Sequence, residues 1–396
     1  MQNERKRDLV FSARHPFLAN CILVVSSTLL AILVVDLVAY NLFDSRRLGT
    51  GSRQFFQFSR LLGWEHRPNA EGTWYAYKDG TRTHVKINSY GFADSDRSTK
   101  KTRPRIALIG DSTTEFWEVA ENSRGQYVLE ETLDGDFEVL NFGLRGAGTD
   151  QTYIRLVEQV IDFAPDIVVY FFCINDFANN VFTGDKPYFV IDRDSPNGIR
   201  VQGYPLRWEP VEDYFWLHQL LEKSFTLRHI KYLIAGIKTH LRTEVPLDEH
   251  FELRPYKRVY DVEDEHRVEL LKKLISAMHR FTREKDIEFL LVEGVYKPAL
   301  DTPLRQQVLD AYGDQFDFEK VTELLSNFSR DGGIEFLSLQ EMVRSGSIDI
   351  NQIMHVEDTM HLNSNGVELF ASAIAERIRS LGWQERAQIN MKVPTE

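Results

Sequence analysis

Five short apolar segments that alternate with helical patterns constrain the fold of this 396-residue chain more than any other feature. Apolar runs rich in β-branched residues are typical of strands buried on both faces. Their alternation with helices predicts an α/β fold with a doubly wound parallel five-stranded sheet and helices on both faces. The expected strands are Ile106–Gly110, Val139–Gly143, Ile167–Phe172, Ile287–Glu293 and Ile334–Leu339, and the expected helices lie near Tyr127–Leu133, Gln151–Phe163, Glu265–Lys285, Pro303–Phe328 and Val367–Leu381.

The first expected strand ends in Gly110-Asp111-Ser112, and this position makes Ser112 the leading candidate for a functional residue. In open α/β sheets, ligands bind at the loops that follow the carboxyl ends of the strands. A serine hydroxyl is a weak nucleophile until an imidazole takes its proton, and a carboxylate fixes the tautomer of that imidazole. Far downstream, Asp358 and His361 supply such a pair three residues apart. The alternative is that Ser112 only caps the helix that follows it.

Two further expected strands are also followed by segments with candidate functional residues. Gly146 stands five residues after Asn141, and Asn175 follows the third strand. Taken in chain order, four segments resemble the conserved blocks of the SGNH (GDSL-type) hydrolases, whose name lists Ser, Gly, Asn and His. These are the segments at Ser112, Gly146, Asn175 and Asp358-x-x-His361. The likeness extends from about residue 106 to residue 381 and implies the flavodoxin-like strand order of that family.

The resemblance also implies a serine esterase mechanism. Ser112 falls on the nucleophile of the family, His361 on the base and Asp358 on its carboxylate partner. Attack on an ester carbonyl creates an oxyanion, which needs hydrogen-bond donors about 2.7–3.1 Å away. The family pattern assigns these donors to the N–H groups of Ser112 and Gly146 and to the side-chain amide of Asn175. A glycine at position 146 would let the backbone approach the substrate without a Cβ in the way, whereas the alternative is a plain turn glycine.

Three nearby residues depart from this pattern or compete with it. Cys173 and Ile174 stand where the family usually has a glycine, and we expect Cys173 to be a buried apolar side chain because nothing near it in sequence would lower its pKa. His355 competes with His361 as the base, but the residues after His361 resemble the last block of the family. We expect no metal site at these histidines, since their spacing matches no known ligand pattern, and no cofactor.

The motif around Ser112 also separates this chain from other families that process esters. Gly-Asp-Ser-Thr-Thr lacks the Gly-x-Ser-x-Gly elbow of the α/β-hydrolases. The order Ser, Asp, His argues against the alginate type of polysaccharide O-acetyltransferase, in which an Asp-x-His pair precedes the serine. Acyl transfer as such stays open.

An apolar segment from Phe17 to Phe43 predicts one transmembrane helix, because its uncharged stretch and its length suffice to cross a bilayer core. A small excess of Lys and Arg before it favours a cytoplasmic N-terminus. We therefore expect a signal anchor that crosses the inner (cytoplasmic) membrane once, with the remaining chain periplasmic or extracellular. Asp36 is expected near the outer interface, and a polar contact with a partner's transmembrane helix is the alternative.

The expected organisation has five parts, namely a cytoplasmic tail (1–16), the anchor helix (17–43), a stalk with β-hairpins (44–104), a hydrolase domain (105–383) and a polar tail (384–396). An insertion at 181–264 interrupts the hydrolase domain and is rich in aromatic residues. It is either a cap over the site, with aromatic faces that suit sugar rings, or a helical subdomain with its own core. Its aromatic residues are Tyr188, Phe189, Tyr204, Trp208, Tyr214, Phe215 and Trp216.

The hairpins are expected within Gly63–Asp94, where Ile87-Asn88-Ser89-Tyr90-Gly91 resembles a segment of membrane-anchored bacterial members of the family.

Composition narrows the range of partners. The chain has 59 acidic and 47 basic residues and a formal net charge of −12, so nucleic acid is not an expected partner. Its two cysteines, one of them in the apolar segment, argue against an intrachain disulfide.

These observations predict a membrane-anchored, bacterial serine esterase that acts on an O-acyl group, in the first place O-acetyl, of a cell-surface glycan such as an acylated polysaccharide. The assignment of the glycan follows from the family alone. The alternatives among enzymes are an O-acyltransferase and a lipid or lysophospholipid esterase. A different class of protein, a catalytically silent carbohydrate-binding or scaffold subunit of a polysaccharide export system, also stays open.

Overall fold

The structure is a computed structural model and describes residues 15–42, 55–75, 82–183, 186–206, 224, 226–227, 230, 252–356 and 358–392. The chain divides into two compact units. One contains Met1–Thr50 and Pro210–Glu244, and the other contains Gly51–Glu209 and Val245–Glu396.

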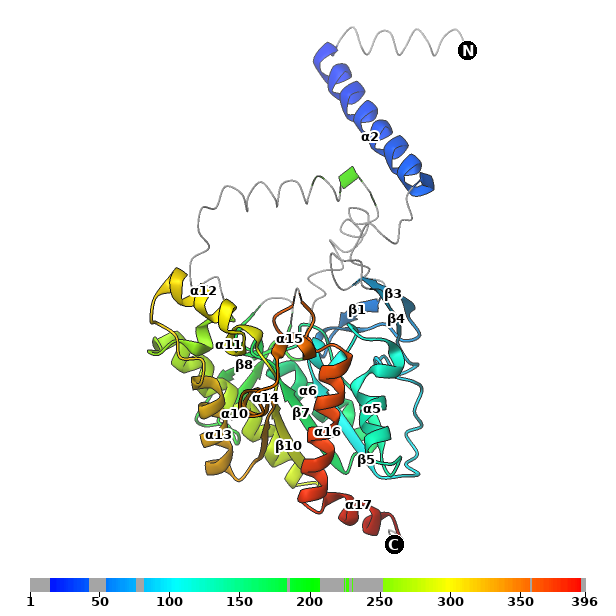
Figure 1. Cartoon of the computed structure of the whole chain (residues 1–396). Coiled ribbons are helices and arrows are strands. Elements are labelled where there is room, and N and C mark those ends of the chain that lie inside the picture. The colour runs from blue at the N-terminus through cyan, green and yellow to red at the C-terminus, as the bar shows by residue number, and fades with distance from the viewer. Residues whose placement is uncertain are drawn as a thin grey trace. The chain divides into compact units, whose positions relative to one another are not determined.

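The second unit is built on a parallel sheet of five strands (Figure 1). These are β5 (Arg105–Gly110), β6 (Glu138–Asn141), β7 (Ile167–Phe172), β10 (Glu288–Glu293) and β11 (Glu335–Ser338). Their order is β11-β10-β7-β5-β6, and every neighbouring pair is parallel. This is the flavodoxin-like order, in which the connections from β5 and β7 diverge and leave a ligand-binding point at the carboxyl ends of these two strands.

Helices cover both faces of this sheet and enclose two hydrophobic cores. Side chains alternate along a strand, so the residues of β7 divide between the two faces. Those at 167, 169 and 171 pack with α5 (Gly125–Thr132) and α16 (Ser364–Ser380). Those at 168, 170 and 172 pack with α6 (Thr149–Glu158), α10 (Val262–Arg283) and α13 (Lys320–Gly332). The sheet is therefore a rigid base for the loops that follow its strands.

Two of the predicted helices end differently in the structure. The prediction of one helix over Pro303–Phe328 is wrong, because α12 (Thr302–Tyr312) ends at Gly313 and α13 begins only at Lys320. Gly313 has a φ of +72°, a conformation that stops a helix and that glycine adopts without strain. In the Gln151–Phe163 region, α6 ends at Glu158 and the 3₁₀ turn η3 (Val160–Phe163) follows.

Short helices fill most of the remaining connections in the described chain. They are α4 (Ser112–Glu115), η2 (Glu121–Ser123), α7 (Asp176–Asn179), η5 (Arg254–Tyr256), α11 (Lys297–Leu300), α14 (Leu339–Ser345), α15 (Ile350–Ile353) and α17 (Trp383–Lys392). Trp383 and Ala387 of α17 are buried, so the segment predicted as a polar tail begins as a helix packed on the core.

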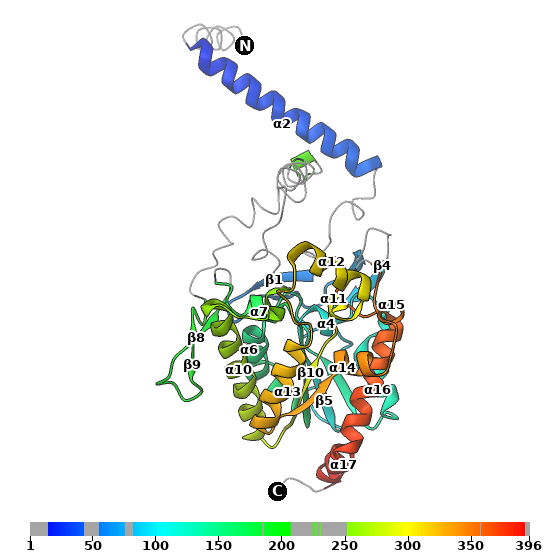
Figure 2. The same ribbon diagram turned by 60° about the vertical axis from the view of Figure 1, so that its left-hand side comes forward.

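Two antiparallel hairpins precede the sheet. Strand β1 (Phe56–Ser59) pairs with β2 (Gly63–His66), and β3 (Glu71–Tyr75) pairs with β4 (Arg82–Lys86). Figure 2 shows β1 and β4 at the same end of the sheet as α4 and α7. The segment after β4 turns around Asn88, whose side-chain oxygen accepts hydrogen bonds from two backbone N–H groups. The hairpins therefore lie at the carboxyl end of the parallel strands.

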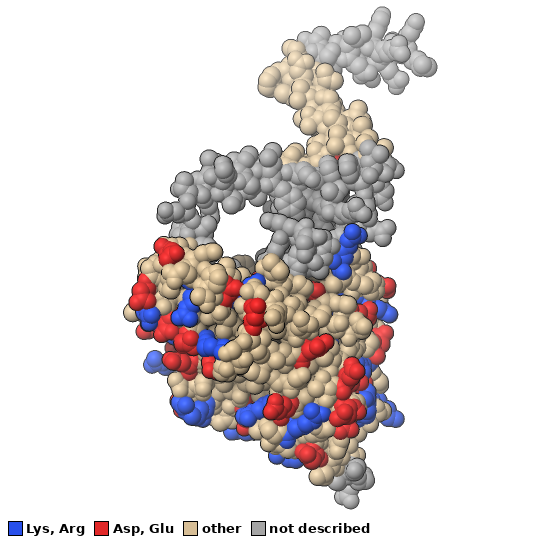
Figure 3. Space-filling model, in the orientation of Figure 1, with Lys and Arg blue, Asp and Glu red and all other residues tan. Residues whose placement is uncertain are grey.

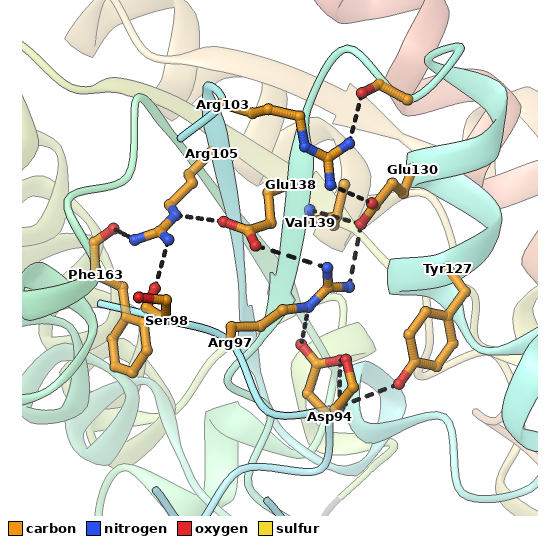
Figure 4. Close-up of polar contacts among 12 residues, drawn as sticks. Asp94, Arg97, Ser98, Arg103, Arg105, Tyr127, Glu130, Glu138, Val139 and Phe163 are labelled. Atoms are coloured by element: carbon orange, nitrogen blue, oxygen red, sulfur yellow. Dashed lines mark hydrogen bonds and ion pairs between the residues drawn. The ribbon is translucent and has the colours of Figure 1, made fainter. Parts of the chain in front are cut away.

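An ion-pair network holds the segment after the hairpins against β5 and β6 (Figure 4). The Arg105 Nε atom at the start of β5 lies 2.6 Å from Glu138 Oε2 at the start of β6. Arg97 pairs with Glu130 of α5 at 3.1 Å and lies 4.0 Å from Asp94. Burial raises the pKa of Asp94 to about 6. The network fastens the chain that precedes the sheet to its first two strands.

Part of the predicted insertion is a third hairpin that the sequence did not predict. Strand β8 (Tyr188–Ile191) pairs with β9 (Ile199–Gln202), and Phe189 packs on Tyr153 of α6 and near α10. This aromatic residue therefore belongs to a core of the domain. Tyr188 and Tyr204 are also described, whereas Trp208, Tyr214, Phe215 and Trp216 lie outside the described residues.

In the other unit, helix α2 (Pro16–Leu42) is long and apolar enough to cross a membrane by length and composition. Figure 3 shows that the described surface of α2 is almost free of charged side chains, whereas acidic and basic residues are mixed over the visible face of the α/β unit. Asp36 has an intrachain contact, since its Oδ1 atom accepts hydrogen bonds from the N–H and the hydroxyl of Thr226 at 2.9 and 2.8 Å.

Candidate active site

Ser112 stands at the first position of α4, directly after β5. Gly110 ends the strand, where a Cβ would lie 2.8 Å from the backbone oxygen of Phe171, so glycine lets β5 and β7 run close together to their ends. Asp111 caps α4, because its Oδ1 atom accepts hydrogen bonds from the N–H and the hydroxyl of Thr113 at 2.9 and 2.7 Å. The alternative in which Ser112 itself is the cap is therefore wrong, and its hydroxyl is left for another partner.

That partner is the imidazole of His361. The Ser112 Oγ and His361 Nε2 atoms are 2.9 Å apart, and His361 Nδ1 lies 2.8 Å from Asp358 Oδ2. The other Asp358 oxygen accepts from the N–H groups of Met360 and His361, which fixes the carboxylate. His355, the competing histidine, donates its backbone N–H to the carbonyl oxygen of His361 at 3.4 Å. The structure thus brings the three predicted residues together in the order that base activation of a serine needs.

Two carboxylates act on the imidazole of His361, that of Glu118 near Nε2 and that of Asp358 at Nδ1. Burial alone would lower the pKa of His361, but the Glu118 and Asp358 carboxylates outweigh burial and raise the pKa to about 9. Burial acts on Asp358 in the opposite sense, yet the hydrogen bonds from His361 and the backbone hold the pKa of Asp358 below its ordinary value. The pair therefore favours a positive charge on the imidazole.

Asn175 lies in the short connection after β7 and directly precedes the first residue of α7. Its Nδ2 atom donates to Asp111 Oδ2 at 2.8 Å, so the carboxylate that caps α4 also holds this amide. An amide nitrogen carries two hydrogens, and Asp111 takes one of them. The Asn175 oxygen is buried without a hydrogen-bond partner among the described residues. Cys173 and Ile174 just before it are buried, and burial raises the pKa of the Cys173 thiol.

Gly146 is an exposed residue in the otherwise largely buried loop after β6 and has a φ of +75°. Trp64 of β2 packs beside it, 3.6 Å from the position that a Cβ would take, and donates its indole N–H to the Arg145 carbonyl oxygen at 3.0 Å. Within the described chain, the backbone N–H groups of Gly146 and Ser112 make no hydrogen bond. Both are therefore available to a ligand.

Sequence reasoning missed a group of charged residues beside His361. Glu118, in the turn after α4, is buried and accepts from Arg145 Nη2 at 2.7 Å. Arg145 also pairs with Glu115 at 3.1 Å, and Glu115 bonds His66 of β2 at 2.7 Å. The Arg145 guanidinium stacks on the Trp74 and Trp117 rings. These residues come from three separate segments, so no local pattern in the sequence could have grouped them.

Residues 106–201 match the family model of the GDSL-like lipases and acylhydrolases. This segment of the α/β unit is therefore similar to the GDSL-type ester hydrolases. The matched region includes Ser112, Gly146 and Asn175 but stops before Asp358 and His361, which the fold brings to the same place.

The solved structures that are similar to this chain share little sequence identity with it. One is the lipase/acylhydrolase from Enterococcus faecalis, with 13% identity, coverage of 70% of this chain and 96% of that chain, and a TM-score of 0.39. A catalytic mutant of an acetylxylan esterase from Geobacillus stearothermophilus has 14% identity, coverage of 71% and 96%, and a TM-score of 0.37. A carbohydrate acetylesterase from Sinorhizobium meliloti has 11% identity, coverage of 70% and 100%, and a TM-score of 0.36. No curated protein matches this chain.

Proposed function

We propose that this protein is a membrane-anchored bacterial serine esterase that removes an acyl group, in the first place acetyl, from an oxygen ester of a cell-surface glycan. The observation that carries the proposal is the continuous hydrogen-bonded path from Ser112 Oγ through His361 to Asp358, with steps of 2.9 and 2.8 Å. Helix α2 supports the anchor and, with it, access to substrates outside the cell.

In the first half-reaction, His361 Nε2 takes the proton of Ser112 as Oγ attacks the ester carbonyl. Asp358 stabilises the imidazolium that forms. The N–H groups of Ser112 and Gly146 and the second amide hydrogen of Asn175 receive the negative oxygen. His361 then donates its proton to the leaving sugar oxygen, and the acyl group stays on Ser112.

In the second half-reaction, His361 takes a proton from water, which attacks the acyl-serine. The same donors stabilise the second oxyanion, and collapse releases the carboxylic acid and restores the Ser112 hydroxyl. A sugar hydroxyl in place of water would make the same site a transferase.

A fluorophosphonate probe tests the nucleophile. It should label the purified wild-type protein, label neither Ser112→Ala nor heat-denatured protein, and label Ser329→Ala as fully as wild type, since Ser329 is a buried serine of α13 away from this site. In parallel, wild-type protein should release acetate from an acetylated oligosaccharide and Ser112→Ala should not. Labelling that persists in Ser112→Ala, or its absence in active wild-type protein, would contradict the assignment.

A further inference from the structure

Glu118 faces the reacting atoms although no family block contains it. Its Oε1 atom lies 3.9 Å from His361 Nε2, the nitrogen that contacts Ser112. Arg145 donates to the same oxygen at 2.7 Å and fixes the carboxylate. The second oxygen of Glu118 accepts no hydrogen bond from the described residues and is not one of their fully buried unpartnered atoms, so a donor from solvent or substrate can reach it. An ionised carboxylate oxygen is an acceptor only, so this atom can take a hydrogen bond from a hydroxyl of the substrate.

The mechanism places Glu118 on the sugar side of the ester. His361 Nε2 has to donate its proton to the leaving sugar oxygen, so that oxygen must come within hydrogen-bond distance of Nε2. A carboxylate 3.9 Å from the same nitrogen is therefore close to the leaving sugar. In a sugar, the hydroxyl on the next carbon is the nearest donor to that oxygen.

We propose that Glu118 accepts a hydrogen bond from the free hydroxyl next to the scissile ester, so that the substrate class is a neutral, partly acylated sugar. This inference rests on the proposed esterase function and makes its substrate more specific. A carboxylate that accepts from a hydroxyl forms a charge-assisted hydrogen bond, which is stronger than a neutral one.

The charges around the site favour a neutral sugar over an anionic substrate. Four carboxylates gather there, those of Asp111, Glu115, Glu118 and Asp358, and within the described residues the Arg145 guanidinium pairs with two of them. A phosphate or carboxylate on the substrate would add a further negative charge beside Glu118 and would have to lose its water to enter. Phospholipids and uronic acid esters should therefore be poor substrates.

Two substrates that differ in one hydroxyl test the inference. One is a methyl xyloside with a single acetyl group next to a free hydroxyl, and the other has hydrogen in place of that hydroxyl. Wild-type protein should have a kcat/KM roughly 10- to 100-fold higher for the first, the range expected for a hydrogen bond to a charged group. Glu118→Gln, which keeps the shape and a partner for Arg145, should reduce this preference to less than about threefold.

A second readout separates substrate contact from a merely structural role. On 4-nitrophenyl acetate, which has no neighbouring hydroxyl, Glu118→Gln should lose much less activity than on the xyloside with the free hydroxyl. The acidic limb of its pH profile should move to lower pH, because Glu118 raises the pKa of His361 together with Asp358, while Arg145 opposes them. Glu121→Gln is the matched control, since Glu121 lies three residues on and its side chain is 46% exposed. It should keep both the sugar preference and the pH profile of wild type.

Several outcomes would overturn the inference. Equal rates of wild-type protein on the two xylosides would do so, and so would a preference that survives in Glu118→Gln or an equal loss of activity on all substrates in that variant. Wild-type protein that neither hydrolyses esters nor reacts with the fluorophosphonate would instead remove the proposed function, and the inference with it.

Discussion

Asp111 connects the two loops that carry the proposed nucleophile and the proposed amide donor. One of its oxygens caps α4, which begins with Ser112, and the other accepts from Asn175. A single side chain thereby sets the distance between two groups that have to act on one carbonyl. The aspartate of the Gly-Asp-Ser motif is therefore a positioning residue.

For Asn175→Ala we expect kcat to fall roughly 10²–10³-fold with little change in KM, because the amide would bind the oxyanion more strongly than the ground-state carbonyl. Steady-state kinetics on an acetate ester measure this, with Asn327→Ala on α13 as a control at a distant position. The double variant with Ser112→Ala should be no less active than Ser112→Ala alone. A higher KM at unchanged kcat would place Asn175 in substrate binding instead.

The activity of the enzyme should rise with pH between about 7 and 9. His361 can accept a proton only when it is neutral, and its pKa is raised to about 9, so the protonated, inactive form dominates below that pH. The pH dependence of kcat/KM on a neutral acetate ester checks this prediction. A profile that is already flat at pH 6 would show that the histidine titrates at or below its ordinary pKa.

At the scale of elements, the hairpin of β1 and β2 contributes to the site through Trp64. Its indole N–H holds the Arg145 carbonyl, and its ring packs beside Gly146. Trp64→Ala should lower kcat/KM roughly 10- to 100-fold, because small displacements of a preorganised donor are costly. Trp64→Phe keeps most of the packing and should lose less. Thermal unfolding measured alongside should shift little compared with the loss of activity, and a large parallel loss of stability would make Trp64 purely structural.

We expect Glu293 on strand β10 to make a pH-dependent contribution to the stability of the fold. Burial raises the pKa of Glu293 to about 7, while the hydroxyls of Thr322 and Ser338 donate to its carboxylate. The folded state therefore binds the proton more tightly than the unfolded state. The proton bound to Glu293 therefore stabilises the folded state. This stabilisation is complete below the ordinary pKa of 4.5 and is lost as pH rises to about 7.

In wild type, the proton on Glu293 should make the free energy of unfolding fall by roughly 3 kcal/mol as pH rises. Glu293→Gln should remove this fall. Denaturant unfolding of wild type and variant at several pH values between about 5 and 8 measures the difference. Glu376→Gln, at an exposed position of α16, is the control and should follow wild type. Parallel curves for Glu293→Gln and wild type would mean that Glu293 stays ionised in the folded protein.

Helices and strands could be predicted from the sequence where the apolar pattern of a segment matches its burial in the folded protein. Ile167–Phe172 is apolar at every position, and β7 is buried on both faces over the same residues. Gly313, which divides α12 from α13, is a single local break that apolar periodicity does not register. At the site, the motifs named Ser112, Asp358 and His361, whose roles stay predictions. Glu118 and Trp64 could not be named, because they reach the site only through the packing of distant segments.

At the scale of the whole molecule, we expect one membrane crossing. Helix α2 is the candidate span of the described chain, so residues 1 to about 16 should be cytoplasmic and the hydrolase unit should lie outside. Fusion of a periplasmic phosphatase to the C-terminus should be active, and fusion of a protein that fluoresces only in the cytoplasm should be dark. The reverse pattern would place the site in the cytoplasm and exclude surface glycans as substrates.

The hairpins before the sheet limit how far the chain can be truncated from its N-terminus. The family match begins at residue 106, yet Phe55 is fully buried and Gln151 donates to the Leu62 carbonyl at 2.6 Å. A soluble fragment that starts at the matched region would expose the surfaces that Phe55 and Leu62 cover and would lack Trp64 and His66. Removal of the apolar helix for work in solution should therefore end upstream of Phe55.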